Sequence, residues 1–320
     1  MARRKAIDHG QASAIMKAIL KAVLKVLHAV FLILCLGYLI YAVVMEGEAI
    51  SQLFLKANVR FILPALLLWP FGVLVSALFA SQIINNTGER IQYRKVLSIY
   101  LNRIPAKYLP GGVWQTFARA YDLNSLGLEK TRIGILVVYE NFWTVMLAAL
   151  ISSIILLLRG SAYIYDELAM LMLAGIFVLI PIAIYFRHKP FVLKVHGYVE
   201  ITVTGLIFWC IAAGSFIFYL HGFEGVMVDQ SLLSFFANYL FAYVIGFISI
   251  FTPQGIGVFE FVMTQLTDFS ILQTQALILL AGFRIIVLLG DMIAWLLFIL
   301  INRTGYFQGA EKNNDDMQNL

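Results

Sequence analysis

The chain has 320 residues, of which 61% are hydrophobic and only 13% are charged, and its mean hydropathy is +0.87. A soluble domain carries about 25% charged residues, so the composition excludes an ordinary soluble enzyme and predicts an all-α polytopic membrane protein. The net charge of +5 comes largely from lysines and arginines in particular loops. It is therefore a topology signal and not a sign of nucleic-acid binding.

The amino-terminal segment is basic. Lys17, Lys21 and Lys25 are four residues apart and share one helical face, which predicts a basic amphipathic helix on the anionic cytoplasmic surface. The alternative is a basic flank that only orients the first span. We divide the chain into a cytoplasmic basic segment (1–25), a membrane domain (26–303) and a polar, disordered tail (304–320).

Six stretches are apolar and long enough to cross a membrane, which takes about 20 residues of helix. They cover about 26–45, 60–82, 133–158, 168–186, 200–220 and 274–301. Two further apolar stretches, about 95–123 and 231–269, are each interrupted by a break that contains proline and glycine, the residue types that break helices. The first break lies at 110–112 and the second at 253–257. We interpret both as re-entrant helical hairpins that enter the membrane and return to the same side. The alternative is one or two tilted spans in each.

Loop charges alternate along the chain. Basic residues gather at 3–25, 90–107 and 187–194, and acidic residues at 46–48, 166–167 and 224–229. Because basic loops stay on the cytoplasmic side, both termini are expected there. The order is then span, span, hairpin, span, repeated once with inverted orientation, as repeat one (about 26–158) and repeat two (about 168–303). Such inverted repeats place a transport site near the membrane midplane.

The two breaks form the candidate binding site. After each break a helix begins whose first N–H groups lack partners and attract anions. Glycine lets a ligand approach the backbone closely, and the breaks supply Gly111, Gly112, Gly255 and Gly257. One such break alone would be read as a simple membrane turn, but a matched pair in two halves favours a substrate site.

Charges at membrane depth are rare, usually paired, and functional by default. Arg119 and Glu140 follow the first break, and Glu260 and Arg284 follow the second. We expect the pairs Arg119–Glu260 and Glu140–Arg284 around a cavity between the halves. Asp291, on the helical face of Arg284, is a further candidate partner. The alternative is that these pairs are salt bridges that only fasten the halves together.

Other residue types give weaker signals. Aromatic side chains near the breaks, Trp114 among them, could line a cavity or an acyl-chain groove, although aromatic residues also suit lipid-facing surfaces. The five histidines make no metal-ligand spacing. The sequence contains no phosphate-binding loop, nucleophile elbow or zinc-protease motif. We therefore expect no catalytic residue, no metal and no cofactor, and interpret the protein as a non-enzyme.

The segment 108–114 with Arg119 and Glu140, and the segment 253–260 with Phe283 and Arg284, resemble the flippase-like family named after the transmembrane region of lysylphosphatidylglycerol synthase. The resemblance covers about 20–303, and Pro-x-Gly-x-Gly-x-x-Glu at 253–260 is its more specific motif. It implies an integral membrane protein that moves or handles lipids. Some members carry an aminoacyl-transferase domain that modifies phosphatidylglycerol. The chain has no room for that domain, so we do not expect this synthesis.

The leading hypothesis is a lipid flippase or scramblase in the bacterial inner membrane. Its substrate would be a lipid with an anionic head group, either a phospholipid or a polyprenyl-phosphate-linked glycan. Arg119, Arg284 and the half-helix ends would hold the phosphate, and Glu140 and Glu260 would balance the charge. The alternative is a non-transporting accessory protein that scaffolds envelope glycan or lipid synthesis. A lipid-modifying enzyme is a third possibility, but no nucleophile–base pair is visible in the sequence.

The expected partners are membrane lipids and, under the accessory hypothesis, proteins of envelope glycan assembly or lipid synthesis. No nucleic-acid partner is expected. The sequence does not indicate an oligomeric state.

Overall fold

The computed structural model describes residues 47–48, 51–52, 54–109, 113–160, 165–175, 193–226, 231–249 and 255–303. Within these ranges the chain is helical and contains no β-strand. The helices with assigned bounds are α2 (Val59–Asn86), α3 (Tyr93–Asn102), the 3-10 helix η1 (Ile104–Tyr108), α4 (Trp114–Ser125), α5 (Lys130–Arg159), α7 (Val195–His221), α8 (Leu232–Ile248), α9 (Val258–Leu266) and α10 (Gln273–Asn302). Residues 165–175 are also helical.

Four helices, α2, α5, α7 and α10, are long and apolar enough to cross a membrane. They coincide with the spans predicted at 60–82, 133–158, 200–220 and 274–301. Each has 27 to 30 residues, or about 40–45 Å at 1.5 Å per residue, against a hydrocarbon core of about 30 Å. The predicted span 26–45, most of 168–186, the basic segment 1–25 and the tail 304–320 lie outside the described residues.

Short helices make up the two interrupted stretches. The first contains α3, η1 and α4, and the second contains α8 and α9. Residues 110–112 and 250–254, which include Pro110 and Pro253, lie outside the described residues. Helices α3, α4 and α9 have 10, 12 and 9 residues, or about 14–18 Å, and the 17 residues of α8 reach about 25 Å. Each of them is therefore shorter than the hydrocarbon core.

Side chains tie the two arms of each interrupted stretch together. Arg103, at the end of α3, donates from Nε and Nη2 to the carboxylate of Asp122 in α4, at 2.6 and 2.7 Å. Asn238 of α8 donates to the carbonyl oxygen of Leu266, the last residue of α9, at 2.7 Å. These bonds make each pair of arms one packed unit.

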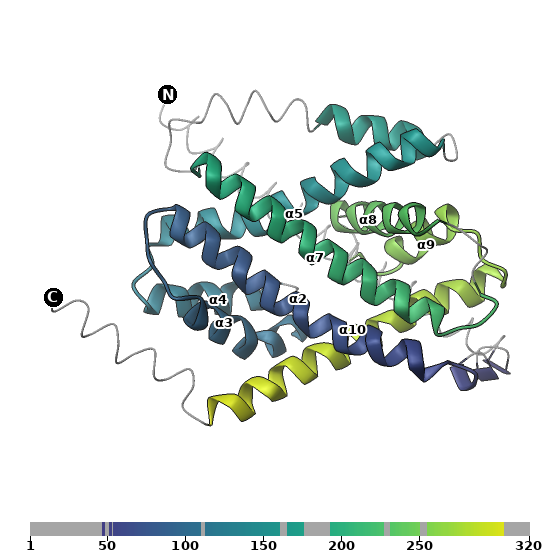
Figure 1. The fold of residues 1–320 in the computed structure, drawn as a ribbon, viewed down its shortest axis with the longest axis horizontal. Helices are drawn as coiled ribbons and strands as arrows, with labels where there is room; N and C mark the ends of the chain where they lie inside the picture. The colour runs from purple at the N-terminus through teal and green to yellow at the C-terminus, as the bar shows by residue number, and fades with distance from the viewer. Residues whose placement is uncertain are drawn as a thin grey trace, which may run out of the picture.

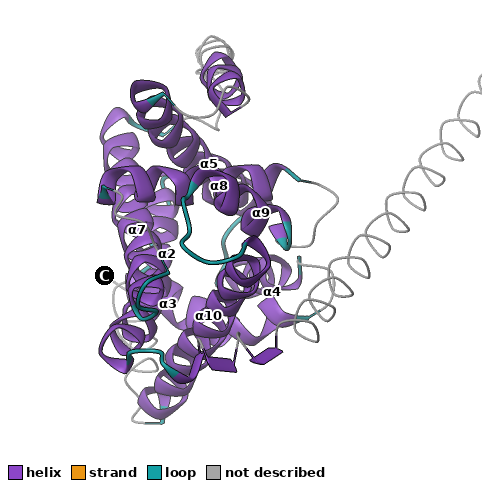
Figure 2. Cartoon of the chain, turned by 90° about the vertical axis from the view of Figure 1, so that its right-hand side faces the viewer, coloured by secondary structure: helices purple, strands orange, loops and turns teal. Residues whose placement is uncertain are grey.

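Helices α2 and α7 lie against each other across the middle of the molecule (Figure 1). Helices α3 and α4 lie toward one end of this pair, and α8 and α9 toward the other. Helix α10 packs on α2, α3 and η1, while α5 packs on α8, α7 and α2; Figure 2 shows α5 beside α8 from the side. The long helix that follows each interrupted stretch therefore packs on the interrupted stretch of the other half.

An aromatic cluster holds α7, α8 and α10 together. The buried ring of Phe216 in α7 lies 4.9 Å from the ring centroids of both Tyr239 in α8 and Phe283 in α10. The Tyr219 hydroxyl donates to the carbonyl oxygen of Leu279 at 2.8 Å. Packed rings combine a large buried area with a preferred geometry, so this cluster fixes α10 relative to the second interrupted stretch.

A large side chain faces a glycine where α10 crosses α2, and again where α5 crosses α7. A Cβ atom on Gly290 would lie 2.8 Å from Cδ1 of Trp69, and a Cβ atom on Gly205 would lie 2.8 Å from Cδ1 of Leu147. Small residues at such crossings let membrane helices approach closely. These two contacts therefore set the spacing between α10 and α2 and between α5 and α7.

We expect Gly290→Ala to destabilise the protein, because the added methyl group would overlap Trp69; overpacking of this kind costs about 1–3 kcal/mol. Gly134→Ala is the matched control, since Gly134 also lies inside a 30-residue helix but its added Cβ would meet no described atom within 4 Å. That change should leave stability the same or raise it, because alanine favours helix. Thermal unfolding of the detergent-solubilised variants measures both effects. Equal melting temperatures would contradict the close contact.

Candidate functional site

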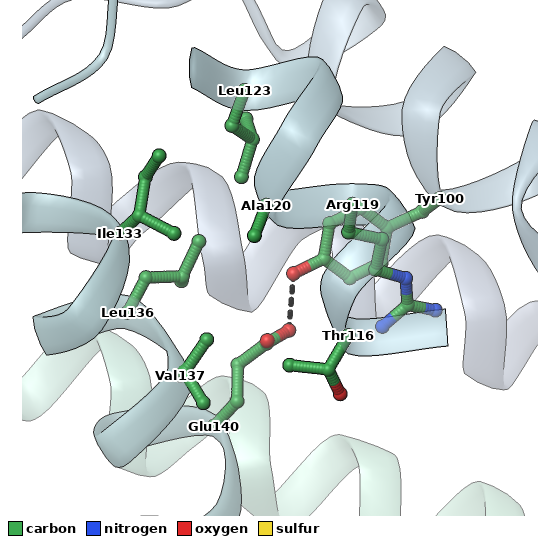
Figure 3. A pocket seen from close by; sticks show the side chains of 9 residues that line it. All are labelled: Tyr100, Thr116, Arg119, Ala120, Leu123, Ile133, Leu136, Val137 and Glu140. Atoms are coloured by element: carbon green, nitrogen blue, oxygen red, sulfur yellow. Dashed lines mark hydrogen bonds between the residues drawn. The ribbon is translucent and has the colours of Figure 1, made fainter. Parts of the chain in front are cut away.

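The first cluster of polar side chains lies where α3, α4 and α5 meet (Figure 3). Tyr100 of α3 is fully buried and donates a hydrogen bond to Glu140 of α5. The guanidinium carbon of Arg119, from α4, lies 3.8 Å from the centroid of the Tyr100 ring, a cation–π contact. The Nε atom of Arg119 is buried and has no hydrogen-bond acceptor among the described residues. A buried donor left unpaired costs about 1–3 kcal/mol, so Arg119 is ready to bind an acceptor.

Tyr100, Arg119 and Glu140 line a small pocket together with Thr116. Its other walls are apolar, formed by Ala120, Leu123, Ile133, Leu136 and Val137 (Figure 3). The free space inside is about 10 Å³, the room that one water molecule needs. A head group would enter only if α4 and α5 moved apart.

The second cluster surrounds the start of α9. Glu260 is at the third position of this helix, and its Oε2 accepts the N–H of Gly257 at 2.7 Å. Its Oε1 accepts from Nε and Nη2 of Arg284 in α10, both at 2.9 Å. The Glu260 side chain is 5% exposed and that of Arg284 is 35% exposed. Glu260 therefore caps α9 and binds it to α10, while about a third of the Arg284 side chain stays exposed.

Gly255 and Gly257 have φ angles of +70° and +85°, in the left-handed region that favours glycine. A Cβ on Gly255 would also lie 3.0 Å from backbone atoms of Gly246 in α8. The sequence therefore needs glycine at position 255 for two reasons, backbone angle and close packing. Together these place the start of α9 directly against α8.

The cross-half pairs predicted from the sequence, Arg119–Glu260 and Glu140–Arg284, are wrong. Glu260 binds Arg284 within the second half, and Arg119 and Glu140 share Tyr100 within the first. The physical reason is proximity, because the short helix after each break packs on the long helix that follows it. In the first half the short helix carries the base, and in the second half it carries the acid.

A third polar cluster joins the two halves. Asp291 of α10 is 3% exposed. Its Oδ1 accepts from Nε1 of Trp69 in α2 at 2.8 Å, and its Oδ2 accepts from Nζ of Lys107 at 2.9 Å and from the hydroxyl of Tyr108 at 2.7 Å. Lys107 and Tyr108 are the last residues of η1, just before the first break. This cluster is the polar link between α10 and the first interrupted stretch.

Sequence reasoning missed Lys107, Tyr108 and Trp69. It gave Asp291, seven residues after Arg284 on the same helical face, as a further candidate partner in the network of Arg284. The Asp291 carboxylate instead bonds to Lys107 and Tyr108 in the other half. The usable signal was that a buried aspartate needs a cation. Lys107 was the nearest lysine to the first break, but it had been counted only as a loop charge.

The remaining candidates are less informative. Gly111 and Gly112 lie outside the described residues. Trp114 is the first residue of α4, is 51% exposed and does not line the pocket of Arg119.

The protein combines long apolar helices, two interrupted stretches made of short helices, and buried ion pairs. This combination defines a multi-pass helical membrane protein. The model of the family described as "Lysylphosphatidylglycerol synthase TM region" matches residues 23–294, which include all three polar clusters. The chain therefore belongs to this family, as the motifs at the two breaks predicted. No curated protein is similar enough to this chain to count as a match.

A double-mutant cycle tests the pairing of the charges. We expect Glu260→Ala and Arg284→Ala to interact by about 1 kcal/mol or more in the free energy of unfolding, because the second change removes a partner already lost. Glu260→Ala with Arg119→Ala should be additive within about 0.5 kcal/mol. Reversible unfolding in mixed micelles gives these values. A large coupling of Glu260 to Arg119, with none to Arg284, would restore the cross-half pairing.

Proposed function

We propose that this protein moves a lipid with an anionic head group across the bilayer, as a flippase or scramblase. Membership of a lipid-related membrane family supports a role with lipids. The observation that carries the finer proposal is that neither arginine is fully enclosed by partners of its own chain. Nε of Arg119 has no acceptor among the described residues, and Arg284 is partly exposed beside a helix start. Guanidinium groups bind phosphate oxygens strongly and in a fixed geometry.

The proposal includes an inverted repeat, and the packing supports it. In this repeat α2 corresponds to α7, α3 to α8, α4 to α9 and α5 to α10. Each main contact between two of these helices has a counterpart between the two corresponding helices. The contact of α10 with α3, for example, corresponds to that of α5 with α8. Helix η1 has no counterpart among the described residues. Inverted repeats with broken helices place substrate sites between the halves.

The two glycine crossings also correspond. Trp69 and Gly205 each lie ten residues after the first residue of their helix, and Gly290 and Leu147 each lie seventeen after theirs. The large and small partners are exchanged between the halves. This supports repeats of about 26–158 and 168–303, with interrupted stretches that are re-entrant and enter from opposite sides.

The charge pattern of the loops supports cytoplasmic termini, and we propose the bacterial inner membrane as the location. We propose no catalytic step, and we assign the buried carboxylates to charge balance.

A second candidate function is an accessory protein that scaffolds envelope glycan or lipid synthesis. The observation that favours it is that both carboxylate oxygens of Glu260 already have partners within the protein. One oxygen caps α9 and the other binds Arg284. A purely structural ion pair would be arranged in the same way. The small free space near Arg119 also fits a closed scaffold.

Lipid translocation in reconstituted vesicles tests the transport proposal. Vesicles that contain fluorescent phosphatidylglycerol and the full chain should move the probe between leaflets faster than empty vesicles. We expect the double variant Arg119→Ala, Arg284→Ala to slow this movement by about tenfold or more, since two phosphate contacts of about 1.5–3 kcal/mol each are lost.

Arg60→Ala with Arg159→Ala is the matched control, because both arginines are exposed at helix ends and the charge change is the same. It should leave the rate unchanged. Wild-type rates in the Arg119, Arg284 double variant would exclude the proposed site. A loss of stability in that variant with no translocation by the wild type would favour the accessory protein.

A further inference from the structure

We propose that Trp69, Lys107 and Tyr108 form an anion-binding site beside the first break, and that Asp291 fills this site in place of the phosphate group of a lipid. The inference rests on the proposed function and adds to it a contact that the head group makes. When an anionic head group arrives, it takes over Lys107 and Tyr108, and Asp291 is displaced.

Three different donors converge on a single carboxylate. The ammonium of Lys107 and the hydroxyl of Tyr108 reach the same oxygen of Asp291 at 2.9 and 2.7 Å, and the indole N–H of Trp69 reaches the other at 2.8 Å. An ammonium, a phenol and an indole N–H donate to phosphate oxygens as readily as to carboxylate oxygens. The cluster is therefore an anion site whose present occupant belongs to the chain.

Exposure allows the exchange. The Asp291 side chain is 5% exposed, that of Lys107 is 28% exposed, and Tyr108 is 45% exposed. The two η1 residues are thus much more exposed than the carboxylate that they bind, so we place the approach of the anion on their side. The Lys107 ammonium also lies 5.7 Å from the ring centroids of both Trp69 and Tyr108. These rings attract the cation and hold it in place while the acceptor changes.

Asp291 differs from Glu260 in what it connects. Glu260 binds partners within its own half, whereas Asp291 connects α10 to η1 and α2. Displacing Asp291 therefore removes the polar contacts of α10 with η1 and α2 and leaves apolar packing between them, while Arg284 still binds α10 to the second interrupted stretch. Binding of the head group would thus change how the halves are held together, as a transport cycle requires.

Equilibrium binding to the purified full chain in neutral detergent tests the site. The probe is dioctanoyl phosphatidylglycerol, measured by titration calorimetry. Asp291→Asn keeps the size of the side chain but removes the competing charge, so we expect binding to tighten by about tenfold. Lys107→Gln removes the cation and should weaken binding by about tenfold or more.

Two further ligands identify the source of the anion. Dioctanoyl phosphatidylcholine, whose ammonium group offsets the phosphate charge, should respond less to either change. Inorganic phosphate should bind more weakly than phosphatidylglycerol, because it lacks acyl chains that bury apolar surface. Equal binding of inorganic phosphate and phosphatidylglycerol would overturn the assignment to a lipid head group.

Glu224→Gln and Lys56→Gln are the matched controls. Both residues are exposed, and the changes remove the same charges as Asp291→Asn and Lys107→Gln. They should leave phosphatidylglycerol binding unchanged. The proposal is overturned when Asp291→Asn and Lys107→Gln both lower the melting temperature and neither changes the affinity in the expected direction. Where Asp291→Asn does not fold, Tyr108→Phe decides, because it removes one donor from a half-exposed ring and should weaken binding.

The outcomes separate this inference from the proposed function. Tighter binding by Asp291→Asn without any translocation in vesicles would keep the anion site and reject the flippase. Translocation that neither Lys107→Gln nor Asp291→Asn alters would keep transport and overturn this site.

Discussion

Helix α10 carries Arg284 and Asp291 two turns apart, and the arrangement of the molecule depends on the partners that these two charges require. An isolated charge at membrane depth is costly, so each must bind an opposite charge. Arg284 binds Glu260 at the start of α9, and Asp291 binds Lys107 at the end of η1. The last long helix is therefore fastened to both interrupted stretches, once through a base and once through an acid. One helix therefore holds residues that flank both breaks, Lys107 before the first and Glu260 after the second.

The breaks need these partners for a second reason. In hydrocarbon, backbone groups freed by a broken helix must be satisfied by protein or by a water-filled cavity. Glu260 meets this need by accepting the N–H of Gly257, and the same carboxylate neutralises Arg284. Polar groups that stabilise an empty break are also those that a polar substrate would contact. Under the proposed function, structural and binding roles would therefore fall on the same side chains. Removal of a charge would then not separate the two roles, so binding must be measured together with stability.

The sequence predicted the spans better than the contacts. The α2, α5, α7 and α10 helices follow from apolar length alone, and Arg119 and Glu140 were found because charges are rare in such segments. Their partners were misassigned. The number of residues between a charge and its break shows which positions correspond in the two halves, but it does not show which helices are neighbours in space. Tyr100 was not found at all. The chain has 15 tyrosines, and nothing in the sequence distinguishes the one whose buried hydroxyl lies between α3 and α5 from the others.

The exchange of signs between the halves suggests how an anion would pass through such a protein. Arg119 has Glu140 close by, and Arg284 has Glu260, so each arginine already has a carboxylate of its own half near it. A head group phosphate that binds Arg284 therefore competes with Glu260, whereas at Arg119 it would meet an Nε donor that has no acceptor among the described residues. Exchange of one acceptor for another keeps every buried cation paired, which avoids the large cost of an isolated charge. Under the proposed function, such exchanges at α9 and α10 would let a charged head group cross the membrane interior without any step that leaves a cation alone.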